Sequence, residues 1–554
     1  MLDDYYDTGS HTMKVTTSSD LAQTWFDRGL AWAYGFNFEE ALRCFTRAAD
    51  ADPDCAMAWW GVAYAGGPVY NRGWTKFDAI ELPRILKETH EAAQRAMALK
   101  DAATDLEQKL IEAIAQRHPS DQAPPDFAVW TDAYADAMRT AHEAHSDNPD
   151  VCSLAAEALM TRTPWRLWDL STGEPREGAS TLEARKILED AIAAVEQKGP
   201  ERHAGLLHCY IHVMEMSPIP EAALRAGDQL GGIIPDSGHL HHMSTHIDFQ
   251  CGHYHNVVVR NSRAIESDLK FLAEHGPLNL YTYSRIHNIH FKLYGAMFLA
   301  QYATAMEAVR EFEETVPEAV IRMESPPMAD ILEGYYGLKY HALIRFGRWQ
   351  EIIDEPLPAD PDLYLVTTAV AHYAKTVAYA ASGDVAGAER EKPKFYAARA
   401  RVPESRMLFN NTCIDILAVA AQMLEGELEY RRGNHEVAFD HLRAAIDLED
   451  NLPYDEPWGW MQPARHALGA LSLEQGKVEE ALTVYRADLG FDPSVIRARR
   501  HPDNVWSLHG LNECLRRLGR EEERAQVQQS LTLAMARADV PIKASCFCRL
   551  SHAA

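Results

Sequence analysis

The side chains best suited to chemistry in this chain are histidines between residues 203 and 290, where 12 of its 25 histidines lie. Two HxxxH pairs stand out: His208 with His212, and His242 with His246. Residues four apart lie on one face of an α-helix. Each pair would therefore present two imidazoles to one point, as a metal ion requires.

Other candidate ligands surround these pairs. His239 precedes the second pair, and a third helix-forming segment, YSRIHNIHFKLYG, adds His287 and His290. Glu215 follows the first pair, and Tyr294 follows His290. The spacing from the first pair to the second is 34 residues at both members. Equal spacing predicts that the two pairs occupy equivalent positions on neighbouring helices.

Several neutral imidazoles with few carboxylates suit copper, zinc or iron. Copper is favoured here, because paired HxxxH helices are similar to the ligand supply of coupled dicopper proteins. We expect one or two ions, held by the seven histidines named above. Glu215 would act as a base on metal-bound water if the ion were zinc, and Tyr294 would hydrogen bond with substrate. The alternative is that these histidines are ordinary surface or core residues.

Nine cysteines, mostly single and within helical segments, indicate reduced core residues rather than a disulfide framework. Cys546 and Cys548 differ, because they form a CxC pattern in a tail that leaves the helical pattern. Thiols suit Cu(I), so these two are further candidate ligands. The alternative is that the tail caps the last helical hairpin.

Composition limits the partners. The net charge of −27 argues against nucleic acid or an anionic membrane as a main partner. No apolar run reaches membrane-spanning length, and the acidic, polar N-terminus does not match a secretory signal. We therefore expect a cytoplasmic protein.

The elements that position these residues are helical. Alternating β-type patterns are nearly absent, which predicts an all-α class. Small and large residues also alternate near the N-terminus in the order that paired helices need, at Trp25, Gly29, Trp32, Phe38, Ala41, Phe45, Ala48 and Pro53. A shorter mark, Gly followed by an apolar residue and then Ala or Val, recurs at Gly252, Gly347, Gly383, Gly433 and Gly476.

These motifs resemble the tetratricopeptide-repeat superfamily, whose unit is about 34 residues long. The chain also looks like large bacterial members of that superfamily that carry a GHLxHMxxHI segment, a subgroup without a function to transfer. The resemblance implies a right-handed superhelical solenoid of about eight to ten helical hairpins. It also implies a concave groove, lined by the first helix of each hairpin, that binds peptides or other ligands.

The resemblance places the paired histidines on groove-facing positions of three first helices, near 206–216, 239–251 and 284–300. It predicts five parts of the chain. These are a tail and first repeat (1–70), divergent hairpins (71–200), histidine-rich repeats (201–350), C-terminal repeats (351–538) and the CxC tail (539–554).

Two hypotheses for function follow. The first is a metal-dependent enzyme, a copper oxidoreductase acting on a small molecule or peptide in the groove. The second is a non-catalytic scaffold that binds a peptide or protein partner. A zinc hydrolase with Glu215 as base is a variant of the first.

Overall fold

The computed structural model describes residues 5–549 and consists of α-helices joined by loops. Within these residues, the one sheet is a small antiparallel hairpin, β1 (Met407–Leu408) with β2 (Asn411–Thr412). The predicted all-α class is confirmed. The chain divides into two compact units, residues up to 247 with 263–285, and residues 248–262 with the chain from 286 onward.

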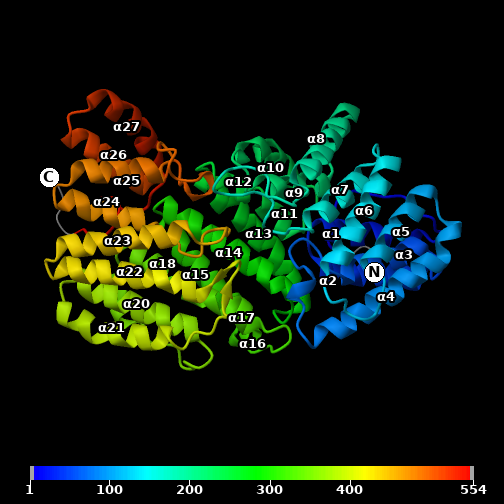
Figure 1. Ribbon diagram of the computed structural model, residues 1–554, viewed down its shortest axis with the longest axis horizontal. Coiled ribbons are helices and arrows are strands. Elements are labelled where there is room, and N and C mark those ends of the chain that lie inside the picture. The colour runs from blue at the N-terminus through cyan, green and yellow to red at the C-terminus, as the bar shows by residue number, and fades with distance from the viewer. Residues whose placement is uncertain (1–4, 550–554) are drawn as a thin grey trace. The chain divides into compact units, whose positions relative to one another are not determined.

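In the first unit, consecutive helices pack as antiparallel neighbours, as the blue and cyan ribbons of Figure 1 show. These helices are α1 (Asp20–Tyr34), α2 (Phe38–Ala51), α3 (Ala56–Gly66), α4 (Glu81–Leu99), α5 (Asp105–Arg117), α6 (Ala128–Ala144), α7 (Pro149–Met160), α8 (Thr181–Lys198), α9 (Ala204–Met214), α10 (Leu224–Leu230) and α11 (Gly238–Met243). Residues 71–200, which we expected to be divergent, also pair in this way.

The boundary between the units passes through α12 (Thr245–Asp248), α13 (Tyr254–His275) and α14 (Tyr281–Phe298). The second unit continues with α15 (Tyr302–Thr315), α16 (Glu318–Ile321), α17 (Met328–Leu332), α18 (Leu338–Arg345), α19 (Trp349–Asp354), α20 (Leu365–Ala381), α21 (Val385–Arg399), α22 (Cys413–Arg431), α23 (His435–Asp450), α24 (Ala464–Glu474), α25 (Val478–Asp488), α26 (Val505–Arg517) and α27 (Glu521–Met535).

The recurring glycines mark turns within hairpins. Gly383 joins α20 to α21, Gly433 joins α22 to α23, and Gly476 joins α24 to α25, all with φ between +75° and +86°. A side chain with a Cβ rarely adopts this left-handed conformation. Glycine therefore ends each first helix and lets the chain reverse.

Glycines also permit close packing between neighbouring helices. The Phe45 ring of α2 lies between Gly29 of α1 and Gly61 of α3, where an added Cβ would come within 2.7 and 2.2 Å of the ring. Tyr485 of α25 is held in the same way between two glycines of α24 and α26. In two distant parts of the chain, an aromatic ring thus packs between glycines of the two neighbouring helices.

One expected helix differs from the sequence prediction. We expected a continuous helix near 239–251, but α11 ends at Met243 and α12 begins at Thr245. The interruption falls at Ser244, whose hydroxyl donates a hydrogen bond to the carbonyl oxygen of Gly227 in α10. A contact with a neighbouring hairpin accompanies the break.

Candidate metal centre

The candidate centre in the first unit is built on α9, which lies unusually close to α1 and α7. A Cβ at Gly205 would come within 2.4 Å of the Ser153 hydroxyl and 2.7 Å of the Tyr34 ring. The missing side chain therefore allows the close approach. At this close approach of α9 to α1, Nδ1 of His208 lies 2.6 Å from the carbonyl oxygen of Tyr34, at the end of α1.

The first histidine pair has an arrangement that hydrogen bonding alone does not explain. A carbonyl oxygen only accepts, so His208 must carry its proton on Nδ1. His212 donates from its own Nδ1 to Glu215, at 3.0 Å. The two Nε2 atoms are 3.1 Å apart. With both Nδ1 atoms protonated, two nitrogen lone pairs face each other in the neutral rings.

Burial keeps these rings neutral. It lowers the pKa of His208 to about 3, and burial together with neighbouring imidazoles lowers the pKa of His212 well below its usual value. No proton then lies between the two Nε2 atoms at neutral pH. Two nitrogens that share an ion at ~2.0–2.1 Å in tetrahedral geometry lie ~3.3 Å apart. The observed separation fits such an ion.

His239 of α11 supplies a third imidazole. A ligand nitrogen from each of His208, His212 and His239 lies within 4.8 Å of the others. The His239 side chain is 4% exposed, and neither ring nitrogen has a hydrogen-bond partner among residues 5–549. Leaving a buried polar group unsatisfied is unfavourable by about 1–3 kcal/mol. A metal ion would satisfy it.

Glu215 connects this trio to the second histidine pair. Its carboxylate accepts hydrogen bonds from Nδ1 of His212 and, at 2.8 Å, from Nδ1 of His246. Nε2 of His246 in turn lies 2.7 Å from Nε2 of His242. Glu215 is fully buried and holds two of the imidazoles in one tautomer.

Three aromatic rings enclose the centre. Phe36 packs on His208 with ring centroids 4.1 Å apart and is stacked on His212 and His239. Tyr70 and Trp165 pack against His212 at 4.9 and 5.6 Å. Sequence reasoning missed all three. Two of them, Tyr70 and Trp165, could have been noticed, because they are aromatic residues in irregular loops outside the repeat pattern.

Two of these aromatic residues have strained backbones. Phe36 has φ +53° and Trp165 has φ +58°, in the left-handed region that non-glycine residues avoid. Such strain is unfavourable by about 1–3 kcal/mol and concentrates at functional sites. Here both strained residues direct their rings at the histidines.

A contrasting cluster shows how satisfied histidines look. Asp150 accepts hydrogen bonds on one carboxylate oxygen from His11, His203 and the Tyr34 hydroxyl, at 2.7–3.0 Å. His203 also accepts from the backbone N–H of Leu206, as the N-cap of α9. Both nitrogens of His203 therefore have a hydrogen-bond partner, in contrast to those of His239.

The remaining predicted residues on α14 belong to the second unit. His287 is stacked on Phe409 at 5.8 Å. His290 is fully buried, its pKa is lowered to about 3 by burial, and its ring nitrogens have no hydrogen-bond partner among residues 5–549. Tyr294 is buried against Phe298, with ring centroids 4.4 Å apart.

Cys546 and Cys548, which the sequence offered as possible ligands or as part of a cap, are bonded to each other as a disulfide. Their sulfurs are therefore not available as ligands in this state. The other seven cysteines form no disulfide.

No protein-family profile and no curated protein matches the chain. Similar solved structures include the APC/C hetero-tetramer Cut9–Hcn1, with 11% identity over 94% of this chain and 88% of that chain at a TM-score of 0.28. Human IFIT1, as a dimer with m7Gppp-AAAA, has 13% identity over 86% and 90% at 0.30. Yeast Tom70 has 11% identity over 92% and 96% at 0.27. At these TM-scores the likenesses carry no argument about a ligand or an activity.

In residues 5–549, we find no helix that is both long enough and apolar enough to cross a membrane.

Proposed function

We propose that this chain is a transition-metal protein whose ion is bound by His208, His212 and His239. The observation that carries the proposal is the pair of facing Nε2 atoms, 3.1 Å apart on neutral rings whose Nδ1 protons are already used. His242 and His246 extend the site through the shared carboxylate of Glu215.

The donor set favours copper, with zinc and iron as alternatives. Neutral imidazole nitrogen suits all three, and divalent affinities rise to copper along the first-row series. A copper ion would supply one-electron chemistry, which is the basis for proposing an oxidoreductase that acts on a small molecule or peptide. Glu215 would orient the imidazoles, and the rings of Phe36, Tyr70 and Trp165 would exclude water from them.

The test is metal analysis of protein purified without a histidine tag and loaded with Cu(II), Zn(II) or Fe(II) in turn. We expect wild-type protein to retain a stoichiometric ion, and the double variant His208→Ala/His212→Ala to retain none. His118→Ala is the matched control, since His118 is also a buried histidine of the first unit outside the trio. Equal metal content in wild type and double variant would refute the site.

The second candidate is a peptide-binding scaffold, and one observation favours it. The chain's own non-helical segment after α27 lies against helices of the second unit, with Ser545 bonded to α24 and Arg549 paired with Glu513 of α26. These contacts show helices of the second unit binding a non-helical segment, which supports the proposal that they also bind a peptide. Binding of a protein or peptide partner that is unaffected by His208→Ala/His212→Ala would separate this function from the metal-dependent one.

A further inference from the structure

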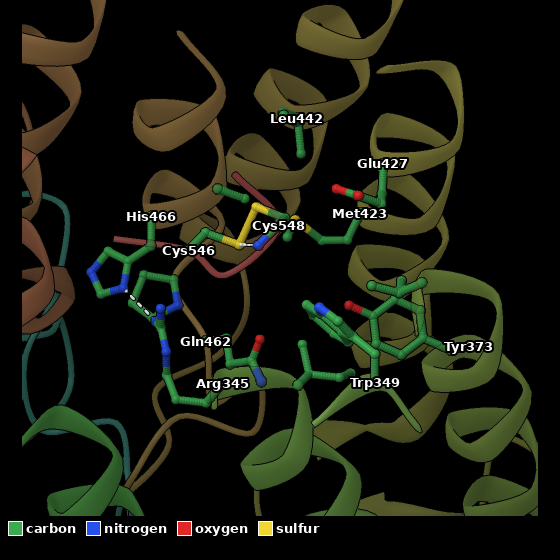
Figure 2. A pocket seen from close by; sticks show the side chains of 14 residues that line it. Arg345, Trp349, Tyr373, Met423, Glu427, Leu442, Gln462, His466, Cys546 and Cys548 are labelled. Atoms are coloured by element: carbon green, nitrogen blue, oxygen red, sulfur yellow. Dashed lines mark hydrogen bonds between the residues drawn. A yellow bond between two sulfur atoms is a disulfide. The ribbon is translucent and has the colours of Figure 1, made fainter. Parts of the chain in front are cut away.

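The second unit contains a small cavity of about 30 Å³, room for about one water molecule, with a disulfide in its wall. Cys546 and Cys548 lie on one side, and Trp349 and Tyr373 lie across from them, as Figure 2 shows. Cys546 is partly exposed, whereas Cys548 is buried in an apolar cluster with residues of α22, α23 and α24. A small molecule that approaches the disulfide from solvent would meet sulfur chiefly at Cys546, the more exposed of the two.

The disulfide is not needed to hold the tail in place. Other contacts anchor the segment on both sides of it: Ser545 bonds to Tyr485 and to the His466 carbonyl oxygen, and Arg549 pairs with Glu513. A disulfide between residues two apart closes a very short loop, and the shortest loops remove the least chain entropy from the unfolded state. A structural cross-link would join distant elements, which this one does not.

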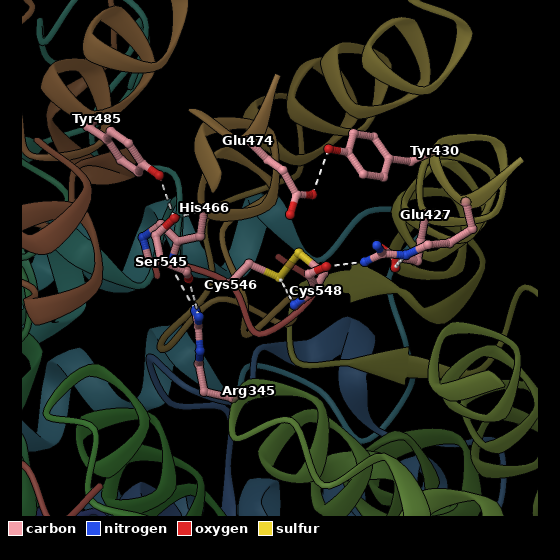
Figure 3. Close-up of a disulfide and its surroundings, with 10 residues drawn as sticks. Arg345, Glu427, Tyr430, His466, Glu474, Tyr485, Ser545, Cys546 and Cys548 are labelled. Carbon is pink, nitrogen blue, oxygen red and sulfur yellow. Dashed lines mark hydrogen bonds and ion pairs between the residues drawn. A yellow bond between two sulfur atoms is a disulfide. The ribbon is translucent and has the colours of Figure 1, made fainter. Parts of the chain in front are cut away.

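The surroundings of the disulfide favour a thiolate. The Arg345 guanidinium donates to the carbonyl oxygen of Ser545, next to Cys546 (Figure 3). The Arg431 guanidinium donates to the carbonyl oxygen of Cys548. The backbone N–H of Cys548 donates to Sγ of Cys546, at 3.2 Å. The donor N–H stabilises the Cys546 sulfur as an anion, which is the reactive form. Arg431 also pairs with Glu427, which lines the same cavity, so its positive charge is offset there.

We propose that Cys546 and Cys548 are a redox-active pair that undergoes thiol–disulfide exchange with a low-molecular-weight thiol that reaches the exposed side of Cys546. Cys546 is the sulfur attacked, because it is the more exposed of the two. Cys548 is the leaving and resolving sulfur.

The exchange has two steps. The thiolate of one small-molecule thiol attacks Sγ of Cys546, the Cys546–Cys548 bond breaks, and Cys548 leaves as a thiolate that takes up a proton. A second small-molecule thiolate then attacks the small-molecule sulfur of the mixed disulfide and releases Cys546 as a thiolate. Two small thiols are oxidised to their disulfide while the protein disulfide is reduced to two thiols, and the reverse runs with the oxidised small molecule.

The test uses the full-length folded chain with reduced and oxidised glutathione as probes, followed by thiol alkylation and mass spectrometry. Wild-type protein in reduced glutathione should gain two alkylatable thiols, at Cys546 and Cys548, without unfolding. Cys548→Ser in oxidised glutathione should trap one glutathione on Cys546. Cys546→Ser should form its adduct at Cys548 at least tenfold more slowly.

Cys251→Ser is the matched control, because Cys251 is a partly exposed cysteine outside any disulfide, elsewhere in the same unit. It should behave as wild type. A native disulfide that is reduced only after urea unfolding would overturn the proposal, as would equal adduct rates in the two single variants. The wild-type experiment decides even if a variant fails to fold, and its result is independent of any metal in the first unit.

Discussion

At the scale of single residues, the histidine trio is organised by groups that bind no ion themselves. Glu215 determines which nitrogen of His212 and His246 carries the proton, and the Tyr34 carbonyl oxygen does the same for His208. A metal binds the unprotonated nitrogen, so these hydrogen bonds prepare the ligands before the ion arrives.

We predict that Glu215→Gln weakens metal binding by about 10–100-fold without unfolding the protein, because outer partners of ligand histidines have effects of this size. An amide oxygen accepts less strongly than a carboxylate, and its N–H group would oppose one of the Nδ1–H groups. Competition with a chromophoric chelator measures the affinity, and circular dichroism checks the helices. Unchanged affinity in a well-folded variant would mean that Glu215 does not orient the ligands.

Some residues of the candidate site could be predicted from the sequence and others could not. The HxxxH spacing brought attention to His208 and His212, because helical geometry alone puts them on one face. Phe36 and Trp165 could not be found in this way. Their left-handed backbones and ring positions depend on tertiary contacts with histidines more than 40 residues away in the chain. The bonded state of Cys546 and Cys548 likewise depends on redox chemistry that spacing does not encode.

At the scale of elements, the fold depends on glycines that let helices approach. Gly61 of α3 faces Phe45 of α2, and Gly510 of α26 faces Tyr485 of α25. At both glycines the facing ring leaves no space for a Cβ atom. The hairpins and their glycine turns were predictable because both follow from local residue preferences. The break in helix 239–251 was not, because nothing in the local pattern ends the helix at Ser244.

We predict that Gly61→Ala destabilises the first unit by about 1–2 kcal/mol, because overpacking against Phe45 outweighs the higher helix propensity of alanine. Urea unfolding followed by circular dichroism measures the effect. Gly73→Ala is the matched control, since no atom lies within 4 Å of its added Cβ. A Gly61→Ala protein as stable as this control would show that the Phe45 ring moves aside freely.

At the scale of the whole molecule, buried neutral histidines are present in both units. Burial lowers the pKa of His341 to about 4. It also lowers the pKa of His466 to about 4, although Asp488 opposes the shift and Arg345 adds to it. Above about pH 6.5, these residues are neutral in both the folded and the unfolded chain. Between about pH 6.5 and 4, only the unfolded chain takes up the protons.

We therefore predict that the free energy of unfolding falls as the pH drops below 6.5, by about 1.4 kcal/mol per pH unit for each such histidine. Urea unfolding of the wild type between pH 8 and 5 measures the slope. His341→Gln should remove one histidine's share of it. Identical slopes in the variant and the wild type would show that His341 takes up its proton in the folded state.

Glu215 has one further consequence, which concerns mechanics rather than chemistry. It follows the last turn of α9 and holds His246 of α12, so one carboxylate connects two successive hairpins. Any flexing between those hairpins must change the separation of the ligand nitrogens. By thermodynamic reciprocity, an ion that stiffens this joint is itself bound more tightly when the joint is held still. The affinity of the centre for its ion would then depend on how freely these two hairpins move relative to each other.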